Sequence, residues 1–245
     1  MSNLKAGVKL ARALLHIVIG FFTILLVFPR LQQEQREQRI QVWSARMLTC
    51  IGIELRVKGQ PAMTGPMLLV ANHISWLDIT SLHAARFCRF VSKADIKQWP
   101  VIGTLAIGVG TLFIERESRR DAMRVVHHMT ERLREGDIIG VFPEGTTSDG
   151  TGLLPFHANL LQAAITAEVP VQPVSIQFMD RATGQRSPAP CYIDDDTLLE
   201  SVWRTLRASG IVVLISFGEP QGAQGRDRRE WAHALREDVA ALRQN

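Results

Sequence analysis

Apolar runs alternate with amphipathic segments along most of the chain. The runs are rich in β-branched residues and predict strands at MLLVA, CRFVS, TLFI, IIGVF, VPVQPVSIQF and IVVLISF. Most of the segments between them predict helices. The clearest helix covers residues 119–136, which carry apolar residues at helical spacing and end at Gly136. Strands that alternate with helices indicate an α/β fold with crossover connections. We therefore predict one α/β domain over residues 53–245, with a single sheet flanked by helices.

The N-terminal segment has a different pattern. Basic residues precede an uncharged stretch at 13–29, whose 17 residues are at the lower limit for crossing a bilayer, which typically takes about 20. No small-residue cleavage site follows, so a signal peptide fits poorly. A second segment carries Ile40, Trp43, Met47 and Ile51 at helical spacing and can lie along an interface. We predict a helical membrane anchor over residues 1–52, which either spans the bilayer or only dips into it. The alternative is a buried core helix.

Composition and charge narrow the class of protein. Of the 245 residues, 46% are hydrophobic, which is enough for a real core. The net charge of +4 suits a membrane surface or an anionic substrate, and no basic run interleaved with aromatics indicates nucleic acid. The three cysteines are far apart, which fits buried thiols in a reducing compartment. No metal is expected, because no cluster of His, Cys and Asp has ligand spacing.

Polar side chains follow three of the predicted strands. Asn72 and His73 come after MLLVA, Arg116 follows TLFI, and Glu144 follows IIGVF. Ligand sites in open α/β sheets gather beyond the carboxyl ends of the strands. If these strands are parallel neighbours, the polar side chains converge on one edge of the sheet.

His73 and Asp78 are five residues apart, a spacing that suits a general base and the carboxylate that orients it. The alternative is a strand end followed by an ordinary helix start. His233 and Asp238 have the same spacing, but they lie in a regular helical pattern where five residues turn about 500° and separate the side chains. The base hypothesis therefore requires that residues 73–78 do not form one continuous helix.

The stretch FPEGTTS, residues 142–148, is the most specific motif. Gly145 permits a sharp turn, Glu144 offers a carboxylate, and Thr146 and Thr147 offer hydroxyls. The alternative is a polar turn that caps the next helix. Arg116 and Lys93 could each bind an anion or form a surface ion pair.

Together these motifs resemble the blocks of the glycerolipid acyltransferase superfamily, in particular bacterial 1-acylglycerol-3-phosphate acyltransferases. NHISWLD, GTLFIER, FPEGTTS and VPVQPVSI are similar to the four blocks in order, and KADIKQWPVIG resembles the stretch between the first two. Two basic positions differ: Thr147 replaces the usual arginine of the third block, and His157 replaces a frequent Lys or Arg. GTTSDG resembles bacterial lyso-ornithine lipid acyltransferases.

The resemblance implies transfer of a fatty acyl group from acyl-CoA or acyl carrier protein to the hydroxyl of a lysolipid, without another cofactor and without a covalent intermediate. The expected acceptor is 1-acylglycerol-3-phosphate (lysophosphatidic acid), with lyso-ornithine lipid or another amino-acid lysolipid as the alternative. It also implies an enzyme of phospholipid biosynthesis at the bacterial inner membrane, with its active site facing the cytoplasm.

The implied catalytic residues are His73 and Asp78. The implied substrate-binding residues are Asn72, Lys93, Arg116, Glu144, Gly145, Thr146 and Thr147. Two other classes stay open: a lipid hydrolase or thioesterase with Ser75 or water as nucleophile, and a non-catalytic membrane-binding module.

Overall fold

A computed structural model of the chain describes residues 3–114, 119–193 and 195–244. The strands are β1 (Ile53–Lys58), β2 (Met67–Ala71), β3 (Arg89–Lys93), β4 (Leu112–Ile114), β5 (Ile138–Val141), β6 (Val171–Asp180) and β7 (Ile211–Phe217). The α-helices are α1 (Asn3–Phe22), α2 (Gln33–Ile51), α3 (Leu77–Ala85), α4 (Ile102–Gly108), α5 (Arg119–Arg134), α6 (Leu161–Ala167), α7 (Leu198–Arg207) and α8 (Arg228–Leu242). Short helical turns are η1 (Thr23–Val27), η2 (Phe28–Arg30), η3 (Ala94–Gln98) and η4 (Ala158–Leu160).

The strands form one sheet of seven in the order β1-β7-β6-β2-β5-β3-β4. Every neighbouring pair is parallel except β6 and β7. The carboxyl ends of β2, β5, β3 and β4 therefore lie at one edge, which confirms the predicted α/β sheet and the convergence of its strand ends. The sequence pattern missed β1, because this edge strand buries only Ile53 and exposes Arg56 and Lys58.

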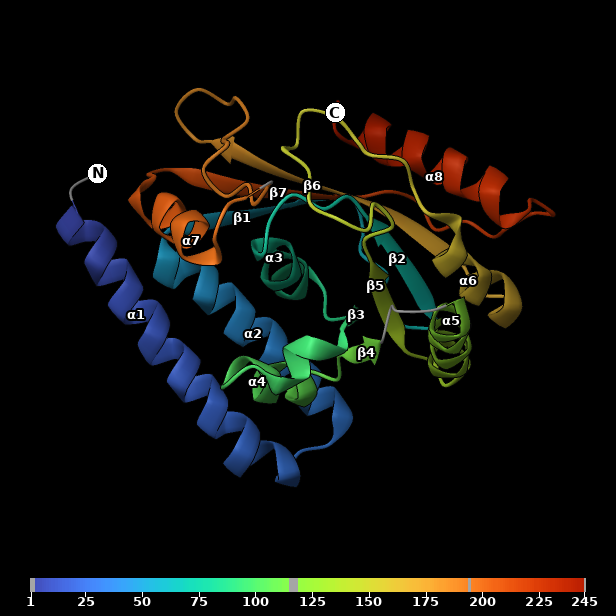
Figure 1. Cartoon of the computed structure of the whole chain (residues 1–245), viewed down its shortest axis with the longest axis horizontal. Coiled ribbons are helices and arrows are strands. Elements are labelled where there is room, and N and C mark those ends of the chain that lie inside the picture. The colour runs from blue at the N-terminus through green and yellow to red at the C-terminus, as the bar shows by residue number, and fades with distance from the viewer. Residues whose placement is uncertain (1–2, 115–118, 194, 245) are drawn as a thin grey trace.

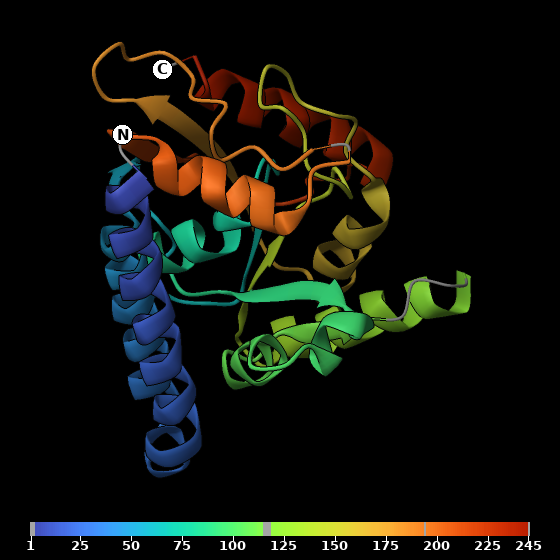
Figure 2. The ribbon, with the colours of Figure 1, turned by 60° about the vertical axis from the view of Figure 1, so that its left-hand side comes forward.

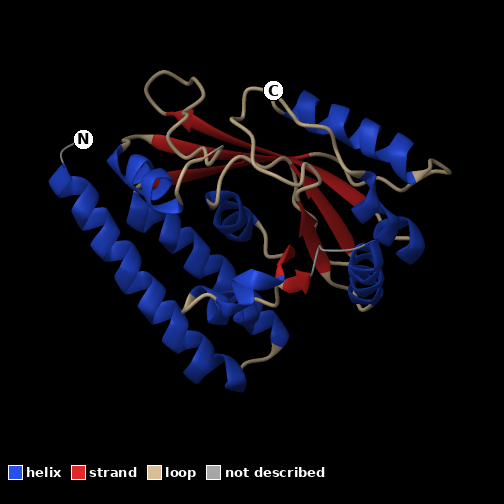
Figure 3. Cartoon of the chain, viewed as in Figure 1, coloured by secondary structure: helices blue, strands red, loops and turns tan. Residues whose placement is uncertain are grey.

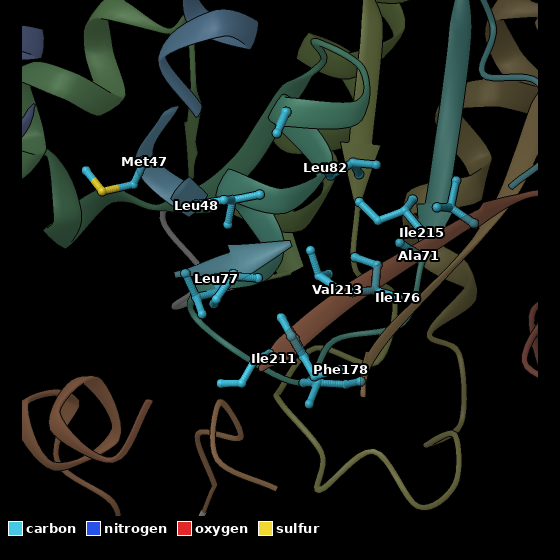
Figure 4. Close-up of a cluster of buried hydrophobic side chains, with 14 of the residues drawn as sticks. Met47, Leu48, Ala71, Leu77, Leu82, Ile176, Phe178, Ile211, Val213 and Ile215 are labelled. Atoms are coloured by element: carbon cyan, nitrogen blue, oxygen red, sulfur yellow. The ribbon is translucent and has the colours of Figure 1, made fainter. Parts of the chain in front are cut away.

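Helices cover both faces of the sheet (Figures 1 and 3). On β2, Leu69 and Ala71 point to the face covered by α2 and α3, while Leu68 and Val70 point to the face covered by α5, α6 and α8. This alternation follows from the two-residue period of a strand. Figure 4 shows the first cluster, in which Met47 and Leu48 of α2 lie near side chains from α3, β2, β6 and β7.

The helices α1 and α2 form a hairpin along one side of the molecule (Figures 1 and 2). Small residues, Ala6, Ala13 and Gly20, make up the buried side of α1. A Cβ on Gly20 would lie 2.6 Å from the indole nitrogen of Trp43, so the two helices pack too closely for a larger residue there. The segment Asn3–Arg30 is long and apolar enough to cross a membrane, with a mean hydropathy of 2.3 and only 11% of its most apolar window buried.

The apolar stripe of α2 does not face outward. Ile40, Met47 and Ile51 are buried, and the last two belong to the same hydrophobic cluster as the sheet. The expectation that this stripe lies along a membrane interface is therefore wrong. An amphipathic stripe can be buried by lipid or by protein, and here the α/β domain buries it.

Candidate active site

The turn between β2 and α3 brings His73 and Asp78 together. Helix α3 begins only at Leu77, so residues 73–78 are not one continuous helix, as the base hypothesis requires. Asp78 Oδ2 lies 2.7 Å from Nδ1 of His73. The same oxygen accepts the backbone N–H groups of Ile74 at 2.6 Å and Ser75 at 2.9 Å. Asp78 is fully buried, so these bonds hold its carboxylate in one orientation.

The imidazole of His73 is fixed on its face as well as at its edge. It stacks on Phe142, with the ring centroids 4.2 Å apart and the planes 8° apart. Phe142 in turn stacks on Phe90 of β3 at 5.4 Å. About a fifth of the His73 side chain (21%) is exposed, and its Nε2 has no hydrogen-bond partner among the described residues. With Nδ1 held by Asp78, Nε2 is the nitrogen that can take a proton from a ligand.

The loop that follows β5 is tied directly to this turn. The backbone N–H of Ser148 donates to the carbonyl of His73 at 2.9 Å, and its hydroxyl does so at 3.2 Å. Thr147 Oγ1 donates to the carbonyl of Tyr192, whose own N–H donates to Ile74. Gly145 has φ +73°, a conformation that favours glycine, and it is exposed. The FPEGTTS loop and the His73 turn therefore form one connected unit.

Glu144 is buried beside the pair. Only 3% of the residue is exposed, and neither carboxylate oxygen has a hydrogen-bond partner among the residues that the structure describes. Burial raises the pKa of Glu144 to about 7, and the nearby charge of Asp78 adds to the rise. The backbone of His73 and the guanidinium of Arg243 act in the opposite direction. Near neutral pH, Glu144 is therefore divided between acid and carboxylate.

The sequence analysis missed Arg243, which follows the last helix. Its Nη2 donates to the carbonyl of Gly150, and its Nε is buried without a partner among the described residues. Its charge interacts favourably with that of Glu144. No sequence signal marks this residue, because it lies about 100 positions from the motif and only the packing of α8 brings it near.

Asn72 has a structural position. It is fully buried; its side-chain amide donates to the carbonyl of Ile176 at 3.0 Å, and its side-chain oxygen accepts the Ile176 N–H at 2.8 Å. These bonds join the end of β2 to β6. The side chain is thus buried and paired with β6, which does not support the predicted contact with substrate.

Ser75 is equally enclosed. Its hydroxyl donates to the carbonyl of Pro190 at 2.5 Å and accepts the N–H of Leu77 at 3.2 Å, and the residue is fully buried. This position argues against Ser75 as a nucleophile.

In α8, His233 lies near Glu237, while Asp238 accepts a hydrogen bond from Gln221. The second His and Asp at this spacing therefore do not pair, as the helical geometry predicts.

The remaining predicted residues have different positions. Lys93 is exposed at the carboxyl end of β3, and Thr146 is exposed in the loop after β5. Arg116 follows β4, which is parallel to β3, but it lies outside the described residues.

Comparisons with known proteins show the family to which this chain belongs. The sequence profile of the Acyltransferase family matches residues 48–177, which include the whole His73 turn and the FPEGTTS loop. The chain belongs to the acyltransferase family. A lyso-ornithine lipid O-acyltransferase of Pseudomonas aeruginosa is 40% identical over 83% of this chain and 78% of that protein. A 1-acyl-sn-glycerol-3-phosphate acyltransferase of Neisseria meningitidis is 35% identical over 85% of this chain and 82% of that protein.

The fold of the whole acyltransferase chain also has a solved counterpart. The crystal structure of the 1-acyl-sn-glycerophosphate (LPA) acyltransferase PlsC from Thermotoga maritima matches it with a TM-score of 0.68, over 96% of this chain and 97% of the other, at 21% identity. The shared fold confirms a mixed α/β sheet flanked by helices. Together the relatives identify this chain as an enzyme that acylates lysolipids.

Proposed function

We propose that His73 is the general base of this acyl transfer and that Asp78 orients its imidazole and stabilises the protonated form. The observation that carries the proposal is the 2.7 Å contact between Asp78 Oδ2 and His73 Nδ1, which leaves Nε2 to face the acceptor. The carboxylate fixes the tautomer with the proton on Nδ1 and stabilises the imidazolium that forms during the reaction.

The proposed reaction needs no enzyme nucleophile. Nε2 of His73 removes the proton from the acceptor hydroxyl while that oxygen attacks the thioester carbonyl carbon. The carbon–sulfur bond then breaks, an ester forms, and the imidazolium returns its proton to the leaving thiolate. Backbone N–H groups near the His73 turn or the FPEGTTS loop would stabilise the oxyanion. The enclosed hydroxyl of Ser75 supports direct transfer over an acyl-enzyme.

The donor would be acyl-CoA or acyl carrier protein, and the first acceptor to test is 1-acylglycerol-3-phosphate. Arg116 and Lys93 would hold its anionic head group, with Glu144, Gly145, Thr146 and Thr147 shaping the site. Lyso-ornithine lipid is the second candidate, because two basic residues of the family pattern are replaced here. Thr147 carries no charge, and its hydroxyl already donates to the Tyr192 carbonyl, so it does not replace an arginine for binding a phosphate.

At the membrane, α1 would lie in the plane of the bilayer rather than cross it. Lys9 on α1 donates to the carbonyls of Leu206 and Ala208, and His16 and Trp43 exchange two hydrogen bonds, so the helix is held along the protein. The start of α2 beside the tip of the hairpin is polar and charged at residues 32–39, which opposes insertion tip first. Because thioester donors are cytosolic, the proposed location is the bacterial inner membrane, with the active site facing the cytoplasm.

One experiment tests the reaction and the acceptor together. Purified protein in detergent is incubated with labelled acyl-CoA or acyl carrier protein and a panel of lysolipids, and the products are identified by mass. We expect one ester product that depends on His73. Acyl release in the absence of any lysolipid would overturn direct transfer and indicate a hydrolase. No product with any acceptor from a folded protein would favour a non-catalytic module.

A further inference from the structure

A second apolar surface lies outside the α1–α2 hairpin. Between β3 and β4, the segment of η3 and α4 exposes Trp99 (48%), Val101 (40%), Ile102 (41%) and Ile107 (51%). We call these four residues the apolar patch. Water-exposed apolar side chains are common singly, but four within nine residues, one of them a tryptophan, indicate a contact surface.

The apolar patch continues the exposed face of α1. Helix α4 packs against the end of that face: a Cβ on Gly108 would lie 2.5 Å from Ile24 of η1, and Val109 packs against the small cluster of Phe28, Ile40 and Phe87. Three large apolar residues near this junction are exposed: Phe22, Leu25 and Leu26. The two surfaces therefore meet at the α4–η1 contact.

The apolar patch also lies at the catalytic edge of the sheet. Its segment begins directly after Lys93, at the carboxyl end of β3. β3 pairs in parallel with β5, and Phe142, the residue after β5, stacks on His73. The patch follows β3 and His73 follows β2, and these two strands lie on either side of β5 at the same sheet edge. Lys93 and Lys97 are exposed beside the patch, with Asp95 between them, so the segment carries a net positive charge.

We propose that the apolar patch is a second membrane contact, which rests on an anionic bilayer beside the active site. Trp99 would lie at the headgroup level, Ile102 would enter the acyl region, and the two lysines would approach lipid phosphates. This contact brings the bilayer to the sheet edge that carries His73, so that a lysolipid reaches the base with its chain still in lipid. The inference rests on the membrane position proposed for α1, and its test separates the two.

The test uses Trp99 as a probe. The protein is reconstituted with phosphatidylethanolamine–phosphatidylglycerol vesicles whose acyl chains carry bromine, which quenches tryptophan on contact. The difference between wild type and Trp99→Phe isolates the emission of Trp99 from that of the other tryptophans. We expect this component to be quenched, more strongly by bromine near the headgroup than by bromine deep in the chains.

Substitutions then test whether the patch itself makes the contact. Ile102→Glu with Ile107→Glu should weaken the local docking equilibrium by at least about tenfold, which is measured as a loss of Trp99 quenching. Met123→Glu is the matched control. Met123 is an exposed apolar residue (74%) on α5, which covers the face of the sheet opposite to α2 and α3. The quenching of Trp99 in this variant should equal that in the wild type. Circular dichroism and thermal unfolding would check that each variant folds.

Three outcomes would overturn the inference. If the vesicles float with the protein but Trp99 is not quenched, the apolar patch is not a membrane contact, although α1 still anchors the chain. If the wild type does not bind the vesicles, both membrane proposals fail. If Trp99 is shielded from iodide before vesicles are added, and the molecular mass is doubled, the patch contacts a second copy of the chain instead.

Discussion

Replacing Asp78 with asparagine tests the proposed base most directly. The substitution keeps the shape of the side chain but removes its charge. In the wild type, Asp78 Oδ2 is 2.7 Å from His73 Nδ1, and Asp78 is fully buried. As His73 takes a proton, the new positive charge is therefore stabilised by a carboxylate in direct contact.

The size of the effect follows from this geometry. Two unit charges about 4 Å apart in an effective dielectric of about 20 interact by about 4 kcal/mol. Loss of this attraction in the transition state corresponds to a rate decrease of about a thousandfold. Because the proton moves only during the reaction, kcat should fall while KM stays near its wild-type value.

The assay is steady-state acyl transfer with the acceptor identified by product mass, measured on Asp78→Asn and on Asp238→Asn. Asp238 belongs to the second His and Asp at this spacing and accepts a hydrogen bond from Gln221, so its variant should stay near wild-type activity. Oδ1 of Asp78 has no partner among the described residues, so an amide there can destabilise the fold by about 1–3 kcal/mol. Thermal unfolding must therefore confirm that the variant is folded. A folded Asp78→Asn enzyme within about tenfold of wild type would refute the assigned role.

The remaining predictions concern neighbouring residues. His73→Ala should lower kcat by at least about 10²–10³ without unfolding the protein, and wild-type turnover by the folded variant would contradict the base mechanism. Asn72→Ala should lower the free energy of unfolding by about 2–6 kcal/mol, because it leaves the buried N–H and carbonyl of Ile176 unpaired; a change in KM with unchanged stability would restore a substrate contact. Burial raises the pKa of Glu144 from 4.5 to about 7 on folding, so its stabilising contribution is complete below pH 4.5 and is lost as pH rises through 7. The free energy of unfolding of Glu144→Gln should therefore rise by about 3 kcal/mol relative to that of the wild type between pH 4.5 and 8. The same pH dependence of the free energy of unfolding in both proteins would contradict this. Arg116→Ala should raise the acceptor KM, and an unchanged KM would count against its contact with the head group.

Much of the fold and the central pair could be predicted from the sequence because they depend on local patterns. A short continuous apolar run, as in Leu68 to Ala71, marks a strand that is buried on both faces, and all six predicted strands are present. Strands that end at one edge bring His73 and the FPEGTTS loop together once the sheet is parallel. A turn before Leu77 lets Asp78 reach back to His73, whereas a regular helix keeps His233 and Asp238 apart. These relations need only short segments of chain.

Tertiary packing decided the rest, because a side chain's surroundings come from residues far away in sequence. The same helical stripe on α2 suits lipid or protein, and only the packed domain shows that Met47 and Ile51 are buried. The sequence motif predicts that Asn72 binds substrate. In the structure its two hydrogen bonds go to Ile176, and they depend on the pairing of β2 with β6. Arg243 approaches Glu144 only because α8 packs against β6 and brings Arg243 to the carbonyl of Gly150, and burial raises the pKa of Glu144 to about 7. Charge and desolvation act through space. The sequence motif therefore predicts the type of chemistry, while the fold determines the surroundings of each group and which groups take part.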